Sequence, residues 1–165
     1  MRHWRFSRGL FSLTVFLVIT GSLVALGCGD GGGSDPAPFE EATVADFSGS
    51  NFSFTASFLD ASFADQRVSL VFGTAVDNTV PFTMTFSGEP TTVITGTGIV
   101  GSIQLRVDAI TEDGASVMST QIGNVVFEVG TVAYTLEAEI SKDNGFFTFR
   151  FTNPVTGAML ELTNF

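Results

Sequence analysis

The chain is nearly devoid of the side chains on which most enzymes and metal sites depend. Its 165 residues include one histidine, His3, one tryptophan, Trp4, one cysteine, Cys28, and one tyrosine, Tyr134. After Cys28 there is therefore no thiol and no imidazole. This excludes Ser-His-Asp and Cys-His catalytic groups, disulfide frameworks and zinc bound by histidine or cysteine from the rest of the chain. We expect a protein that is not an enzyme.

Basic residues are also scarce. The chain has 17 acidic and 7 basic residues, a net charge of −10. Arg2, Arg5 and Arg8 supply three of the basic residues, so residues 28–165 keep four against all 17 acids, a net charge of −13. Such a surface repels phosphate, so we expect neither a nucleic-acid partner nor electrostatic adhesion to anionic lipid.

The N-terminus has the pattern of a secretory signal. The three arginines are followed by an uncharged, strongly apolar run from Gly9 to Gly27. A basic segment before an apolar one is typical of signal peptides. Because about 17–25 apolar residues suffice to cross a bilayer, an uncleaved membrane anchor is the alternative.

The residues at the end of the apolar run help to distinguish a cleaved signal from an uncleaved anchor. Residues 24–28 read Val-Ala-Leu-Gly-Cys, which resembles the lipobox of bacterial lipoproteins, where apolar or small residues and then Gly or Ala precede a cysteine. The resemblance implies that residues 1–27 are removed as a lipoprotein signal peptide. It also implies that Cys28 is the lipid-attachment site and carries the acyl chains, palmitate among them, that form the contact with the membrane.

The same resemblance implies a location. Each buried methylene contributes about 0.8 kcal/mol to membrane attachment, so two or three chains hold a protein firmly. The implied place is the cell envelope, outside the cytoplasm. In Gram-negative lipoproteins an Asp directly after the cysteine favours the inner membrane. Gly29 stands there in this chain, so the outer membrane is favoured if the host has one.

Composition divides the remaining chain into a tether and one domain. Cys28 and residues 29–38, rich in Gly and Pro, are expected to form a lipidated, flexible tether with a typical reach of about 17 Å. Residues 39–165 are long enough for one domain with a sizeable core.

Apolar and polar residues alternate through most of this domain, and this predicts half-buried antiparallel strands. The alternation covers residues 52–58, 80–87, 103–109, 132–140 and 147–151, and shorter candidate strands are residues 68–72, 91–95, 125–129 and 159–163. Only residues 59–67 would accommodate a helical turn. The prediction is an all-β fold, a single antiparallel β-sandwich or small β-barrel of about 8–10 strands.

Turn residues support the strand pattern and supply the best candidates for a metal site. Asp143-Asn144-Gly145 predicts a tight hairpin, because Asn-Gly favours positive φ angles, and Glu112-Asp113-Gly114 predicts a second turn. Calcium would favour the oxygen atoms of these turns. No Asp-x-Asp-x-Asp-Gly loop occurs, so turn formation and solubility are the preferred roles. We predict no metal or cofactor.

Phenylalanine is abundant, with 18 residues in the chain. A core packed with rings is the first interpretation. An apolar ligand cavity inside a barrel is the alternative, and a void lined by Phe52, Phe82, Phe149 and Phe151 would favour it. Glu137 and Glu139 fall on one strand face and form a carboxylate pair, the residue type of glycosidases. They are expected on the solvated face, and Trp rings that stack on sugars are lacking.

These observations predict a membrane-anchored lipoprotein with a non-catalytic β domain. Its expected role is protein interaction, with an envelope protein as partner, or envelope structure. The alternative is a carrier or sensor of an apolar ligand in a Phe-lined barrel.

Overall fold

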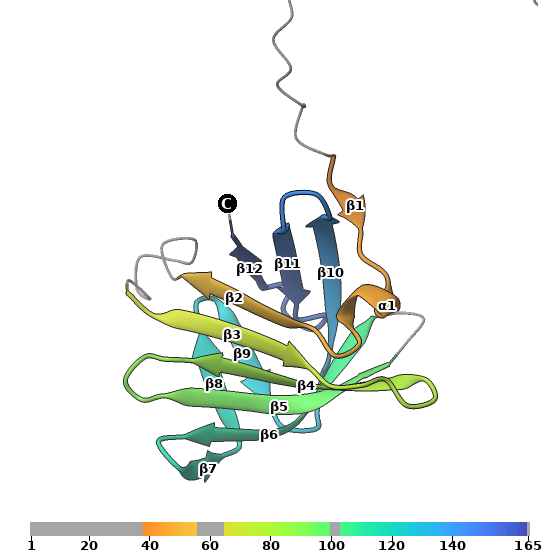
Figure 1. Ribbon diagram of the computed structural model, residues 1–165. Coiled ribbons are helices and arrows are strands. Elements are labelled where there is room, and N and C mark those ends of the chain that lie inside the picture. The colour runs from red at the N-terminus through yellow and green to blue at the C-terminus, as the bar shows by residue number, and fades with distance from the viewer. Residues whose placement is uncertain (1–37, 56–64, 100–102, 165) are drawn as a thin grey trace, which may run out of the picture. The chain divides into compact units, whose positions relative to one another are not determined.

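The structure is a computed structural model that describes residues 38–55, 65–99 and 103–164. Within them the chain forms twelve strands and one short helix (Figure 1). The elements are β1 (Glu40–Glu41), α1 (Val44–Phe47), β2 (Asn51–Thr55), β3 (Arg67–Phe72), β4 (Thr79–Phe86), β5 (Thr92–Ile99), β6 (Gln104–Glu112), β7 (Ala115–Val117), β8 (Ser119–Ile122), β9 (Val125–Glu128), β10 (Ala133–Ser141), β11 (Phe146–Thr152) and β12 (Met159–Thr163).

Ten of these strands form one antiparallel sheet in the order β12-β11-β10-β6-β5-β4-β3-β2, with β1 beside β10 and β7 beside β6. Strand β10 pairs with β6 only over Ala133–Thr135. At this narrow junction the sheet divides, and Figure 1 shows β2–β5 lying across a second layer that contains β10–β12 and the β8–β9 hairpin. Among the described residues the two edge strands, β2 and β12, do not pair with each other, so the sheet does not close. The predicted all-β fold is confirmed, and it is a sandwich-like fold rather than a closed barrel.

Phenylalanine rings join the two layers. Phe52 lies 4.7 Å from Phe149 between ring centroids, and Phe54 lies 4.8 Å from Phe147. Strands β2 and β11 thus meet through inward-facing rings of the alternating pattern, mostly edge to face, the arrangement that aromatic quadrupoles favour. Phe47 of α1 closes the cluster, 5.9 Å from Phe149. The abundance of Phe is explained by packing between layers.

Tyr134 of β10 connects the β8–β9 hairpin to the larger sheet through a ring contact and two hydrogen bonds. Its ring lies 4.8 Å from that of Phe127. Its hydroxyl donates a hydrogen bond to the Val126 carbonyl (2.9 Å) and accepts one from the Glu128 amide (2.8 Å). The Asn153 side chain donates to the same carbonyl of Val126 at 3.2 Å. A small separate sheet is in this way held by polar contacts as well as by burial.

The two predicted turns differ in geometry. Asp113 and Gly114, with φ of 45° and 84°, form a two-residue connection in which Glu112 pairs with Ala115. Positive φ at both positions is typical of the hairpin turns whose twist matches that of the strands. In the turn between β10 and β11 only Gly145 has a positive φ, 66°, and its amide donates to the Ser141 carbonyl. This turn has four residues, so the expected tight Asn-Gly hairpin was wrong in type though right in place.

The structure has a helical turn outside the segment in which one was expected. Helix α1 spans Val44–Phe47, whereas Arg67 begins strand β3 and residues 59–64 lie outside the described residues. The amide and hydroxyl of Thr43 donate to the Asp46 carboxylate at 2.8 and 2.7 Å. Thr-x-x-Asp at the first turn supplies this contact without any helical period, so one turn escapes periodicity analysis. The short strands β1, β7 and β8 were missed as well.

Candidate functional site

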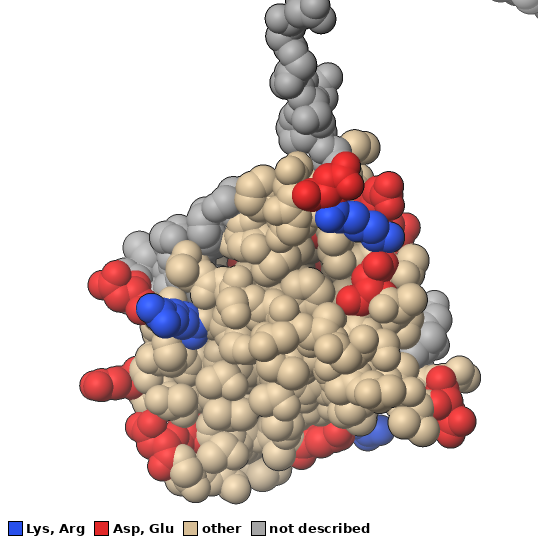
Figure 2. Space-filling model, in the orientation of Figure 1, with Lys and Arg blue, Asp and Glu red and all other residues tan. Residues whose placement is uncertain are grey.

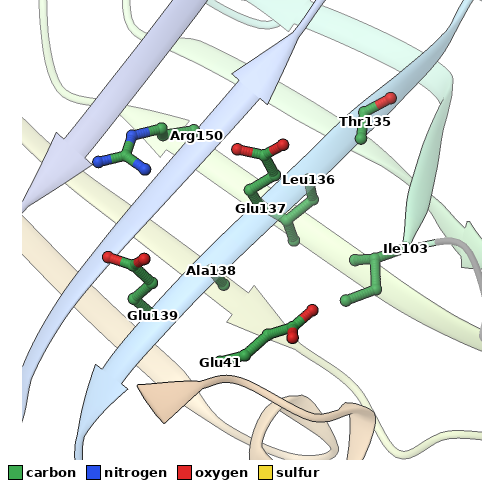
Figure 3. Close-up of a pocket in the computed structure, with 8 residues that line it drawn as sticks. All are labelled: Glu41, Ile103, Thr135, Leu136, Glu137, Ala138, Glu139 and Arg150. Carbon is green, nitrogen blue, oxygen red and sulfur yellow. The ribbon is translucent and has the colours of Figure 1, made fainter. Parts of the chain in front are cut away.

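An open groove of about 480 Å³ lies where strand β10 changes partners (Figure 3). Strand β10 pairs with β6 as far as Thr135 and with β1 from Glu139 onward. Two backbone hydrogen bonds mark the ends of the stretch of β10 between these two pairings. The Leu136 amide donates to the Ile103 carbonyl and the Ala42 amide to the Ala138 carbonyl, each at 2.8 Å. The groove thus follows from the division of the sheet.

The lining of this groove is acidic. The side chains of Glu41, Glu137 and Glu139 stand on the same side of the sheet as Arg150 (Figure 3). The register explains this, because Glu41 is opposite Glu139 and Glu137 is opposite Arg150 in their antiparallel pairs. Three carboxylates and one guanidinium therefore line the groove.

Arg150 is already engaged on its other side. Its Nε atom lies 2.6 Å from a carboxylate oxygen of Glu161, the residue opposite it on β12. That hydrogen-bonded ion pair raises the pKa of Arg150 above its ordinary value, and Glu139 and Glu137 add to the effect. The guanidinium is thus held in the charged form, facing carboxylates on both sides. Among the described residues no group of three His, Cys, Asp or Glu side chains is placed to hold a metal ion.

Sequence reasoning found part of this groove. Alternation placed Glu137 and Glu139 on the solvated face, and both are exposed in the structure. It missed Glu41 and Ile103, because nothing local indicates that β1 and the start of β6 meet β10. Arg150 was visible as a polar residue between Phe149 and Phe151. Its place opposite Glu137 required the register of β10 with β11.

The rings expected to line an interior cavity are buried or packed against neighbouring rings. Phe82, Phe149 and Phe151 are at most 2 % exposed, and Phe52 packs its ring against Phe147 and Phe149. Between the layers, beside Phe47 and Phe72, lies a void of only about 10 Å³. That is about the space that one water molecule needs. The four rings proposed to line a cavity are instead part of the packed core.

The remaining candidate residues do not come together. Glu112 accepts a hydrogen bond from the Thr120 hydroxyl, and Asp113 accepts one from the Thr91 amide at 2.8 Å. Both serve the turn after β6, whereas Asp143 and Asn144 lie in the turn after β10. The four oxygen-bearing residues considered for calcium thus belong to two separate turns. Cys28, the predicted lipid-attachment residue, lies outside the described residues.

Comparison of the chain with protein-family models, with curated proteins and with solved structures finds no match in any of the three. Within the described ranges, no helix has the length and apolar character needed to cross a membrane.

Proposed function

We propose that the chain is a membrane-anchored bacterial lipoprotein whose β domain acts without catalysis, by protein interaction or as a structural part of the cell envelope. The lipid on Cys28 provides the anchor and residues 29–38 provide the tether. The basic start, the apolar run and the lipobox-like residues 24–28 support the anchor. The absence of His and Cys from residues 29–165 supports a role without catalysis.

One observation supports action from the surface: the rings pack between the layers, and open grooves of about 480, 440 and 200 Å³ lie at the surface of the described residues. A carrier of an apolar ligand needs an enclosed cavity of several hundred Å³. The void beside Phe47 is about 10 Å³. Protein interaction is therefore favoured over a carrier role.

The anchor is tested by Cys28→Ala in the full-length chain, expressed in its host with radiolabelled palmitate. Ser34→Ala, a change of similar size in the tether, is the matched control. We expect Cys28→Ala to abolish label incorporation, to block removal of residues 1–27 and to release the domain from lipid attachment. Equal labelling of both variants would refute the lipoprotein assignment.

The interaction is tested by placing a photocrosslinking amino acid at Glu137 in the groove, and, as a control, at Val155, which is 79 % exposed in the loop after β11. We expect illumination of intact cells to give one reproducible adduct from position 137 that position 155 does not give. Identical adduct patterns from both positions, or no adduct at 137, would count against an interaction through the groove.

A further inference from the structure

Arg67 is the one basic residue in the described part of the chain whose side chain has no partner there. Lys142 lies 3.4 Å from Asp46, Arg150 pairs with Glu161, and Arg106 donates to the Gly130 carbonyl at 3.5 Å. No ion pair or side-chain hydrogen bond joins the Arg67 guanidinium to another described residue, although acids outnumber bases in this domain.

Arg67 belongs to a regular array on the outer face of β2–β4. The register sets Ser53 beside Ser69 and Ser69 beside Thr85, which makes one row of three hydroxyl groups. In the next row Arg67 stands beside Thr55, and its amide donates to the Ser87 hydroxyl at 2.7 Å. A guanidinium flanked by two hydroxyl groups thus lies next to a row of three, about 4.8 Å apart between strands and about 6.7 Å apart along them.

These six residues line a shallow groove of about 440 Å³. The volume lies within the range of small-molecule sites. Strands β2–β5 contain no acidic residue, and Arg67 is their only charge. Figure 2, in the orientation in which these strands lie in front, shows a broad uncharged surface with acidic groups at its margins. The array itself therefore contains no carboxylate, and Asp65, two residues before Arg67 in the chain, lies outside it.

The chemistry of the array selects its ligand. A guanidinium binds carboxylate through paired, charge-assisted hydrogen bonds, and the Ser87 hydroxyl, which accepts from the Arg67 amide, can donate as well. The row of hydroxyl groups suits a ligand that itself offers hydroxyls. The net charge of the domain disfavours polyanions. We propose that this groove binds a sugar acid, with the carboxylate on Arg67 and the ring hydroxyls over Ser53, Ser69 and Thr85.

Binding is expected to be weak for a single sugar. The groove has no Trp, and the Phe54 ring is turned into the core, 3 % exposed. Among the described residues that line the groove no aromatic face is available for stacking, so hydrogen bonds and one ion pair must supply the affinity. Millimolar dissociation constants correspond to about 4 kcal/mol, which a few such bonds can provide. The inference does not depend on the protein partner proposed above.

The test is a titration of the full-length, isotope-labelled chain in detergent, followed by NMR. The probes are D-glucuronate, D-glucose, which lacks the carboxylate, and acetate, which lacks the ring hydroxyls. We expect glucuronate to shift the Arg67 Nε–H signal and the amides of Ser53, Ser69 and Thr85. Glucose and acetate should bind at least about tenfold more weakly, because each forfeits part of the hydrogen bonding.

Variants make the test specific. Arg67→Gln should lower glucuronate affinity at least about tenfold, the loss expected for a charge-assisted pair. Arg106→Gln removes the same charge outside the array and should leave binding unchanged. Thr85→Val keeps the shape of a strand residue, removes one hydroxyl and should weaken binding to a smaller extent. No glucuronate binding up to tens of millimolar, equal binding of acetate, or binding that survives Arg67→Gln would overturn the proposal.

Discussion

Glu41 on β1 and Glu139 on β10 stand directly opposite each other in an antiparallel pair, with Glu137 two residues away on the same face. Like charges at opposite positions destabilise a strand pair. Arg150, the one cation among the described residues that line the groove, is held by Glu161 at 2.6 Å. The pairing of β1 with β10 at the acidic groove is thus destabilised by repulsion between carboxylates.

Glu41→Gln is therefore expected to stabilise the protein. Removing one of two opposed carboxylates should raise the free energy of unfolding by about 0.2–1 kcal/mol at low salt. The gain should vanish in about 1 M salt, where the screening length falls to about 3 Å. Urea unfolding at two salt concentrations measures both. Glu40→Gln is the control, because Glu40 lies 3.8 Å from Lys142 and its removal should not stabilise. A salt-independent gain would contradict repulsion as the cause.

Tyr134→Phe should destabilise the protein by about 1–3 kcal/mol, because the Glu128 amide loses its acceptor and the Val126 carbonyl one donor. Denaturant unfolding at neutral pH measures the loss. Thr135→Val, a change of one hydroxyl at the next position on the opposite face, is the matched control and should cost less. Equal losses would show that the tyrosine hydroxyl has no special part in holding β9.

The same variant tests a pH dependence. Burial raises the pKa of Tyr134 above the ordinary 10.0. The folded state then retains the phenolic proton more tightly than the unfolded state. The contribution of the protonated Tyr134 to the free energy of unfolding is therefore complete below pH 10 and is lost as the pH rises through the folded pKa. We expect the unfolding midpoint of the natural protein to fall more steeply above pH 10 than that of Tyr134→Phe. Parallel curves would contradict this.

Gly96→Ala should destabilise far more than Gly98→Ala. A Cβ atom at Gly96 would lie 2.0 Å from the Arg106 carbonyl oxygen and 2.7 Å from the Phe82 ring, beside the irregularity between β5 and β6. At Gly98 the contacts are with methyl groups of Leu105 and Val80, at 2.9 and 3.0 Å. Overpacking of a rigid site costs about 1–3 kcal/mol or more, and mobile side-chain ends can yield. Thermal unfolding of both variants measures the difference, and similar losses would refute this account.

Asp46→Asn should remove an acid-dependent part of the stability. Hydrogen bonds from the Thr43 amide and hydroxyl lower the pKa of Asp46 below 3.8, with a further contribution from Lys142. This contribution is present above the unfolded pKa and is lost as the pH falls through the folded one. Because the carboxylate is near solvent, we expect a loss below about 1 kcal/mol at pH 7. Urea unfolding between pH 7 and 2 should show curves that converge at acid pH. Asp143→Asn is the control, and curves that stay apart would contradict the assignment.

Periodicity correctly predicted nine strands, because each of them buries one face and its apolar residues therefore recur at every second position. Strand β11 is the clearest case, with Phe147, Phe149 and Phe151 buried and Arg150 between them. The same reasoning missed strands β1, β7 and β8, which are too short to show a period. It also shortened β5, where Gly96 and Gly98 replace apolar side chains on the buried face.

The candidate sites were less accessible to sequence reasoning than the fold. Alternation showed that Glu137 and Glu139 share a face, but it did not single out Ser53, Ser69 and Thr85 as members of a site. It did not show that Glu41 meets Glu139, or that Arg67 is flanked by Thr55 and Ser87. Those neighbours depend on which strands pair and in which register, and a shift of one residue would turn every side chain to the other face.

By itself, the order of residues determined which reactive side chains residues 29–165 lack, where most of the strands lie and which faces they bury, because these depend on side-chain type and on neighbours along the chain. Only the tertiary structure decided that the sheet divides at β10 instead of closing, that the Phe rings fill its interior, and which charges remain unpaired outside. Those outcomes depend on contacts between segments far apart in the chain, such as Phe52 with Phe149, and no local sequence pattern predicts such contacts.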